Sequence, residues 1–116
     1  MYASFENLDV WKRASQLAVR VYDLLGNCRD FGLQDQMQRA AVSIASNIAE
    51  GAERGPKEFA HFLRIARGSA AELRTQAYIA AKIGLIKPED MNEIVEETKQ
   101  LAKMLYALAK SLKTEN

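Results

Sequence analysis

RAAVSIASNIAEGAERG, residues 39–55, is the stretch that decides the fold. Its composition is that of a helix, yet little of it is bulky. The positions near its inward face are small or polar: Ala40, Ala41, Ser43, Ala45, Ser46, Asn47 and Ala49. Small side chains let a neighbouring helix backbone come close, and hydroxyl and amide groups can hydrogen-bond one another along that contact. The stretch therefore predicts a tightly packed helix with one polar seam.

Three other segments repeat apolar residues at the spacing of a helix, so four helices are expected. They cover residues 8–25, 34–50, 56–83 and 88–113. Asn7 is expected to cap the first helix at its N-terminus. Pro56 and Pro88 suit the first turns of the third and fourth helices. Gly51 and Gly84 are expected to end the second and the third.

Short connections place consecutive helices antiparallel, so the sequence predicts an all-α, up-down-up-down four-helix bundle in a single domain, residues 1–116. Strands are not expected, because no alternating Val, Ile and Thr run is bounded by turn residues. The alternative topology is a three-helix domain whose fourth helix packs on a partner.

Composition favours an ordinary globular protein without membrane segments. Of the 116 residues, 48% are hydrophobic and 27% charged, and the net charge of +1 predicts no general affinity for polyanions. The single cysteine, Cys28, rules out an internal disulfide and fits a reducing compartment. The first residues lack a basic segment followed by an apolar run, so no signal peptide is expected. We expect a cytoplasmic protein.

The third expected helix carries an arginine stripe beside its core face. The stripe consists of Ala60, Arg64, Arg67, Ala71, Arg74 and Tyr78. One interpretation is ion pairing, within the chain or between subunits, with Glu50, Glu53, Glu58 or Glu72. The other is a nucleic-acid-binding surface, because arginine interleaved with tyrosine suits phosphates and bases. The binding hypothesis rests on the three arginines and Tyr78.

The same helix is apolar on a second side. Ile65 and Ile79 fall on the side away from the core, alongside His61, Gly68 and Glu72. A helix that is apolar on more than one face is usually buried on more than one side. Ile65, Gly68 and Ile79 therefore predict a subunit interface in a homo-oligomer.

Catalytic and metal-binding patterns are weak. Glu58 and His61 have the Glu-x-x-His spacing of a di-iron bundle, but that site needs two such motifs and this chain has one histidine. Ser43 has no partner nearby in sequence that could act as its general base, and Cys28 has no second Cys or His near it. No enzyme activity, metal or cofactor is expected.

Three blocks carry a family resemblance: FENLDVW (5–11), RAAVSIASNIAEGAER (39–54) and FAHFLRIARGSAAEL (59–73). They resemble the four-helix-bundle family first noted as proteins encoded in intervening sequences of bacterial 23S ribosomal RNA genes. The resemblance extends from Phe5 to about Gly84. Residues matching the family motif are Asn47, Glu50, Gly51, Arg54, Gly68, Ser69 and Glu72. No catalytic role comes with them, because the family has no established activity.

The resemblance implies an antiparallel four-helix bundle that assembles into a homopentamer. It also implies a distant likeness to the accessory variability proteins of diversity-generating retroelements, basic pentamers that bind nucleic acid and a reverse transcriptase. This chain departs from them in being nearly neutral. At the end of the second helix, we predict that Asn47, Glu50 and Arg54 pair across the corner at Gly51.

These observations lead to one first hypothesis about function and two alternatives. The first is a non-enzymatic, homo-oligomeric accessory protein associated with RNA, DNA or a ribonucleoprotein, with no membrane partner. The second is a protein-binding scaffold without nucleic-acid affinity, whose arginines form salt bridges between subunits and whose protein partner is unidentified. The third is an enzyme or metal protein using Glu58 and His61.

Overall fold

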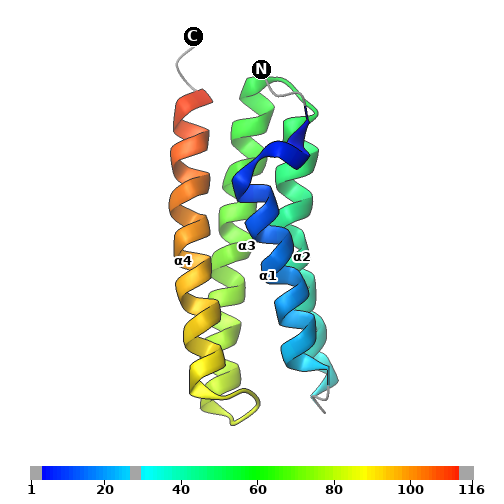
Figure 1. The fold of residues 1–116 in the computed structure, drawn as a ribbon, viewed down its shortest axis with the longest axis vertical. Helices are drawn as coiled ribbons and strands as arrows, with labels where there is room; N and C mark the ends of the chain where they lie inside the picture. The colour runs from blue at the N-terminus through cyan, green and yellow to red at the C-terminus, as the bar shows by residue number, and fades with distance from the viewer. Residues whose placement is uncertain (1–3, 27–29, 113–116) are drawn as a thin grey trace.

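The computed structural model describes residues 4–26 and 30–112, and within these ranges it contains helices and no strand. A short 3-10 turn, η1 (Phe5–Asn7), precedes four α-helices. These are α1 (Asp9–Leu25), α2 (Phe31–Ala52), α3 (Pro56–Lys82) and α4 (Pro88–Ser111). The bundle measures 48 × 20 × 19 Å (Figure 1).

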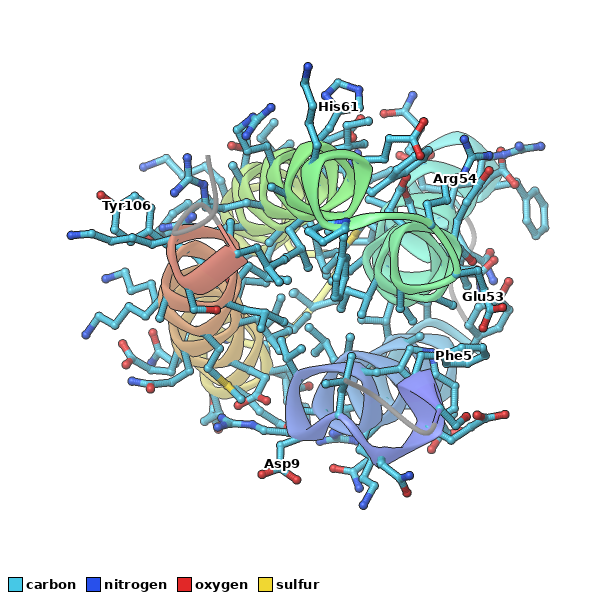
Figure 2. The ribbon with its side chains drawn as sticks, turned by 90° about the horizontal axis from the view of Figure 1, so that it is seen from above. Phe5, Asp9, Glu53, Arg54, His61 and Tyr106 are labelled. Atoms are coloured by element: carbon cyan, nitrogen blue, oxygen red, sulfur yellow. The ribbon has the colours of Figure 1, made fainter. Side chains whose placement is uncertain are left out.

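The helices form a ring in chain order around one core (Figure 2). Each packs on its sequence neighbour, and α4 also packs on α1, which closes the ring. This confirms the predicted four-helix bundle. The three-helix alternative is wrong, because α4 lies against α1 and α3 of its own chain.

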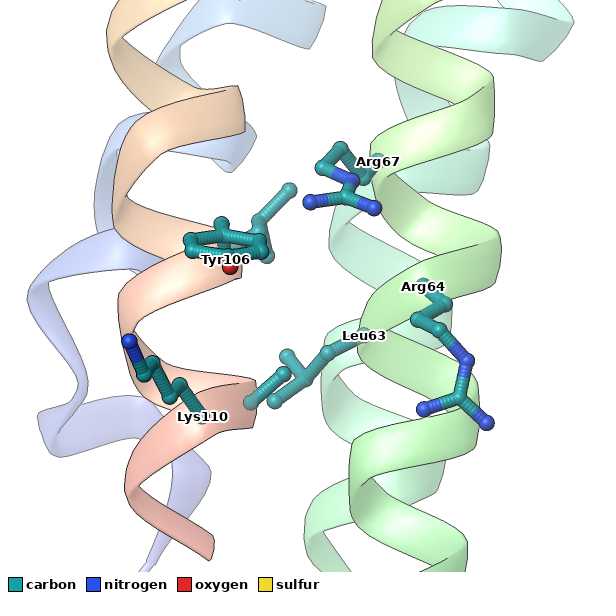
Figure 3. Close-up of a pocket in the computed structure, with 7 residues that line it drawn as sticks. Leu63, Arg64, Arg67, Tyr106 and Lys110 are labelled. Atoms are coloured by element: carbon teal, nitrogen blue, oxygen red, sulfur yellow. The ribbon is translucent and has the colours of Figure 1, made fainter. Parts of the chain in front are cut away.

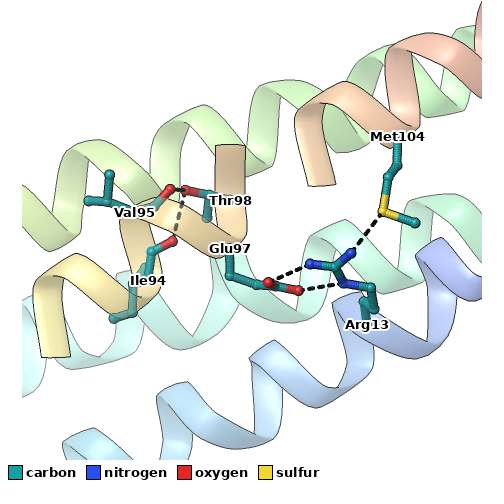
Figure 4. Close-up of polar contacts among 6 residues, drawn as sticks. All are labelled: Arg13, Ile94, Val95, Glu97, Thr98 and Met104. Atoms are coloured by element: carbon teal, nitrogen blue, oxygen red, sulfur yellow. Dashed lines mark hydrogen bonds and ion pairs between the residues drawn. The ribbon is translucent and has the colours of Figure 1, made fainter. Parts of the chain in front are cut away.

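The core is a continuous apolar column to which every α-helix contributes. Its large, fully buried side chains are Val21, Leu25, Met37, Ile44, Ile48, Leu63, Leu73, Ile94, Leu101 and Leu105. Burying each stabilises the fold by roughly 1.5–3 kcal/mol. Thr98 is the polar member of this set, and its hydroxyl donates to the backbone carbonyls of Ile94 and Val95, each at 2.9 Å (Figure 4).

The N-terminal ends of α1 and α2 differ from the sequence expectation. Asn7 does not cap α1; it lies in η1, and Leu8 holds the cap position without a side-chain hydrogen bond. Helix α2 begins at Phe31, three residues before the expected start at residue 34. The cause is Asp30, whose carboxylate accepts from the backbone N–H of Leu33 at 3.0 Å. That bond satisfies one of the free amides of the first turn.

The expectation that Gly51 ends the second helix is also wrong. Gly51 is buried and helical, and α2 continues to Ala52. A Cβ placed on Gly51 would lie 2.6 Å from Cβ of Phe62 and 3.0 Å from Cδ1 of Phe59. The glycine is therefore needed for the close approach of α2 to the start of α3.

The third helix ends as expected. It stops at Lys82, and Gly84 follows with a φ of 80°, a backbone conformation that favours glycine. Helix α4 ends at Ser111, and the expected end at residue 113 lies outside the described residues. Cys28 also lies outside them.

Ion pairs position α4 on α1. The Arg13 guanidinium donates to both carboxylate oxygens of Glu97, at 2.9 and 2.7 Å, and a further N–H points to the Met104 sulfur at 3.5 Å (Figure 4). Arg20 donates to both oxygens of Glu93, at 2.8 and 3.0 Å. This hydrogen-bonded guanidinium holds the pKa of Glu93 below its ordinary value.

Candidate nucleic-acid interface

The arginine stripe of α3 borders α4. Arg64 and Arg67 stand at the α3–α4 seam, where they line a pocket with residues of α4 (Figure 3). Arg74 lies seven residues beyond Arg67 and therefore on the same side of the helix. Arg67 and Arg74 are half-buried, whereas Arg64 and Tyr78 are exposed. The structure therefore aligns all four predicted residues along one side of α3.

Two α4 residues that the sequence expectation missed complete this surface. Tyr106 and Lys110 line the same pocket as Arg64 and Arg67, and the guanidinium carbon of Arg67 lies 5.1 Å from the centre of the Tyr106 ring. That distance is typical of a cation–π contact. We call the surface formed by Arg64, Arg67, Arg74, Tyr78, Tyr106 and Lys110 the basic α3–α4 face.

The cations of this face have no acidic partner in the part of the chain that the structure describes. Its ion pairs are Arg13–Glu97, Arg20–Asp90, Arg20–Glu93, Arg39–Asp35 and Arg54–Glu50. Arg64, Arg67 and Arg74 appear in none of them. Ion pairing within the chain therefore does not account for the stripe over residues 4–26 and 30–112. Pairing between subunits stays a prediction.

Charge is separated between the two sides of α4. The groove between α1 and α4 is lined by Glu93, Glu96 and Glu97 together with Arg13 and Arg20. The pocket between α3 and α4 has cationic residues on its lining and no acidic one. A net charge near zero is thus compatible with a locally positive surface.

The polar seam of residues 39–55 is confirmed at the contact between α2 and α3. The hydroxyls of Ser43 and Ser69 are hydrogen-bonded at 2.9 Å. The Asn47 side-chain amide donates to the Ser43 carbonyl at 2.9 Å and to the Ser43 hydroxyl at 3.0 Å. These groups satisfy one another where two helices with small side chains pack closely.

At the α2–α3 corner the structure brings together two of the three predicted partners. Arg54 pairs with Glu50 at 3.0 Å and lies over the Phe62 ring, 4.9 Å from its centre. Asn47 bonds to Ser43 instead and belongs to the polar seam. The corner is therefore defined by the Glu50–Arg54 pair and by the packing of Gly51 against Phe62.

The predicted interface residues of α3 lie at the surface. The side chains of Ile65 and Ile79 are 39% and 48% exposed, and Ile83 follows at 58%. Gly68 is exposed, and a Cβ placed on it would meet no atom within 4 Å. This part of α3 is therefore open to a partner, as an interface requires.

Glu58 and His61 are both exposed. His61 points outward from α3 (Figure 2) and meets the Phe62 ring edge-on at 5.7 Å between centres. Among residues 4–26 and 30–112, no group of three His, Cys, Asp or Glu side chains is placed to hold a metal. None of the described helices is long and apolar enough to cross a membrane.

Comparison with known proteins identifies the relatives of the chain. Residues 6–107 match the family described as 23S rRNA-intervening sequence protein. A solved structure from Bacteroides thetaiotaomicron, described as a protein of unknown function from the S23 ribosomal protein family, has the same fold. It aligns with a TM-score of 0.81 and 24% identity over 87% of this chain and 98% of its own. No protein with a curated description matches the sequence.

Proposed function

The chain belongs to the family of 23S rRNA-intervening sequence proteins, and we propose that it is a non-enzymatic, homo-oligomeric accessory protein that binds nucleic acid through its basic α3–α4 face. The observation that carries this proposal is the set of arginines Arg64, Arg67 and Arg74, none of which is neutralised by a carboxylate in the described residues. Guanidinium groups bind phosphate oxygens, and adjacent tyrosine rings offer surfaces on which bases stack.

Assembly multiplies this surface. The exposed residues Ile65, Gly68 and Ile79 lie along one side of α3, on either side of the exposed Glu72, and are available for contact with a second copy of the chain. The family resemblance favours a homopentamer, in which five copies of the basic face lie around one ring. A nearly neutral chain then presents several basic surfaces at once, and binding to the same polyanion becomes multivalent. We place the assembly in the cytoplasm.

A protein-binding scaffold is the second candidate. The exposed side chains of Ile65, Ile79 and Ile83 on one side of α3 favour it, because large exposed apolar residues on one face are typical of protein interfaces. In that case the arginines pair with carboxylates of a neighbouring subunit, and nucleic acid is not bound.

Salt-dependent RNA binding separates the two candidates. The anisotropy of a labelled single-stranded RNA is measured with the purified protein at about 50 and 200 mM salt. We expect binding at low salt that weakens as salt rises. The triple variant Arg64→Glu, Arg67→Glu, Arg74→Glu should lose RNA binding at low salt, because it removes three cations that contact phosphates. For the wild type, each phosphate contact should contribute about 0.7 to the slope of log affinity against log salt.

A charge-matched control keeps this test specific. The variant Lys12→Glu, Arg39→Glu, Lys87→Glu changes the net charge equally, but its substitutions lie on α1, on α2 and before α4. It should retain most of the affinity. Equal losses in both variants would contradict the assignment to the basic α3–α4 face, and no binding at low salt would favour the scaffold.

A further inference from the structure

The pocket at the seam of α3 and α4 differs from the rest of the basic α3–α4 face because it has an apolar floor. Leu63 and Leu105, both fully buried, close it on the core side, and Ala109, 9% exposed, also lines it. Its lining also includes the cationic side chains of Arg64, Arg67 and Lys110 (Figure 3). An apolar base with charged groups around it suits a flat, apolar ring attached to an anionic group.

The size of the pocket limits what it can hold. Its volume is about 150 Å³, well below the roughly 300–1,000 Å³ of sites that enclose a whole drug-sized ligand. One ring system can enter, while the remainder of the ligand must stay on the surface. This is the behaviour of a subsite in a longer binding surface.

Tyr106 provides the surface on which such a ring can stack. Its side chain is 55% exposed, so one part of the ring is accessible. Arg67 lies over one side of the ring, 5.1 Å from its centre, and Lys110 follows one turn further along α4 (Figure 3). Aromatic rings bind bases by stacking whatever the base, because every base has a π-face.

Resting on the proposed function, we infer that this pocket takes one unpaired nucleobase, which stacks on Tyr106 while Arg64 and Lys110 hold its flanking phosphates. The basic α3–α4 face then selects single-stranded over double-stranded nucleic acid. In a duplex the bases are paired and stacked inside the helix, so none can enter a side pocket without being pulled out. A single strand offers its bases freely.

The remaining residues of the face fit the course of a strand. Arg74 lies ten residues from Arg64, which is about 15 Å along α3 at 1.5 Å per residue. The exposed ring of Tyr78 lies one turn further. A single strand with one base in the pocket can therefore follow α3 and meet a second cation and a second aromatic ring.

The test compares the same strand alone and in a duplex. A mixed-sequence RNA of about 12 nucleotides that forms no hairpin, within the usual site size of single-strand binders, is measured by anisotropy alone and annealed to its complementary strand. The variants are Tyr106→Leu, Tyr106→Trp and the control Tyr22→Leu. Tyr22 is 49% exposed and lies on α1, away from the basic α3–α4 face.

We expect the wild type to bind the single strand more tightly than the duplex. Tyr106→Leu should weaken single-strand binding by about fivefold to a hundredfold, the range that base–aromatic stacking gives, and leave duplex binding unchanged. Tyr106→Trp keeps a stacking surface and should keep the affinity, and Tyr22→Leu should alter neither substrate.

The measurements distinguish an error in the pocket inference from an error in the proposed function. The pocket inference is overturned if Tyr106→Leu binds the single strand like the wild type while the triple arginine variant does not. Equal wild-type affinity for duplex and single strand also overturns it, with the proposed function intact. If the wild type binds neither at low salt, both are wrong.

Discussion

Gly51 of α2 lies against Phe62 of α3 so closely that a Cβ on the glycine would stand 2.6 Å from the phenylalanine Cβ. Cβ atoms in proteins do not approach this closely, and neither atom is at the end of a flexible side chain. Any larger residue at position 51 must push the two helices apart at the point where the chain turns from one into the other.

We predict that Gly51→Ala destabilises the protein, although alanine is the better helix former by up to about 1 kcal/mol. Overpacking at this contact should cost roughly 1–3 kcal/mol, measured by urea denaturation. Gly32→Ala is the matched control, since Gly32 is an exposed residue of the same helix and a Cβ there would meet only the Asp30 side chain, at an ordinary contact distance of 3.6 Å. It should be neutral or stabilising. If Gly51→Ala unfolds at the same urea concentration as the wild type, α2 and α3 can move apart at this contact without cost, which would contradict the prediction.

Asp30 should stabilise the start of α2. Replacing it with alanine removes the acceptor for the Leu33 amide and should cost about 1 kcal/mol in the free energy of unfolding. Asp35→Ala serves for comparison. Asp35 lies beyond the first residues of α2, and its ion pair with Arg39 is exposed to solvent, so its loss should change the stability little. Similar effects of the two substitutions would argue against a special role for the cap.

The Arg20–Glu93 pair predicts a pH dependence of stability. Because the folded-state pKa of Glu93 lies below its ordinary value, its contribution is present above the unfolded pKa of about 4.3 and is lost as pH falls through the folded pKa. Wild type should therefore be more stable than Glu93→Gln at neutral pH, and the difference should disappear in acid. Thermal unfolding across that range measures it. A difference that persists in strong acid would exclude the ion pair as its source.

Homo-oligomer formation is predicted to depend on the exposed strip of α3. The double variant Ile65→Asp, Ile79→Asp should lower the molar mass measured by light scattering, because buried carboxylates in an apolar interface are costly. Val19→Asp is the control: Val19 is 63% exposed on α1, outside this strip. A monomeric wild type, or dissociation in the control, would contradict the interface.

The four helices can be predicted from the sequence because the apolar spacing along one helix is a local property. The sequence also predicts that Arg64, Arg67 and Arg74 lie on one side of α3, since residues three and seven apart share a helix face. It did not find Tyr106 and Lys110. Their position beside those arginines depends on how α3 and α4 are aligned along the bundle, and that alignment is set by packing between distant residues.

The two boundary errors in α2 have similar causes. A glycine near the end of an apolar pattern is most simply interpreted as a helix stop, and only the position of Phe62 shows that Gly51 is needed for close packing. The expected start of α2 is later than the observed one because the apolar spacing of the helix becomes regular only near Met37. The capping bond of Asp30 extends the helix without adding to that pattern.

The α1–α4 seam has a consequence for the order of folding. The other three helix pairs are neighbours in the chain and can form through local contacts, which favours fast folding. The contact of α1 with α4 is the least extensive of the four and joins residues 84 apart in the Arg13–Glu97 pair. Its formation requires the two ends of the folded chain to meet. We therefore expect the ring to close last along this seam, and its amides to exchange with solvent before those of the α2–α3 contact.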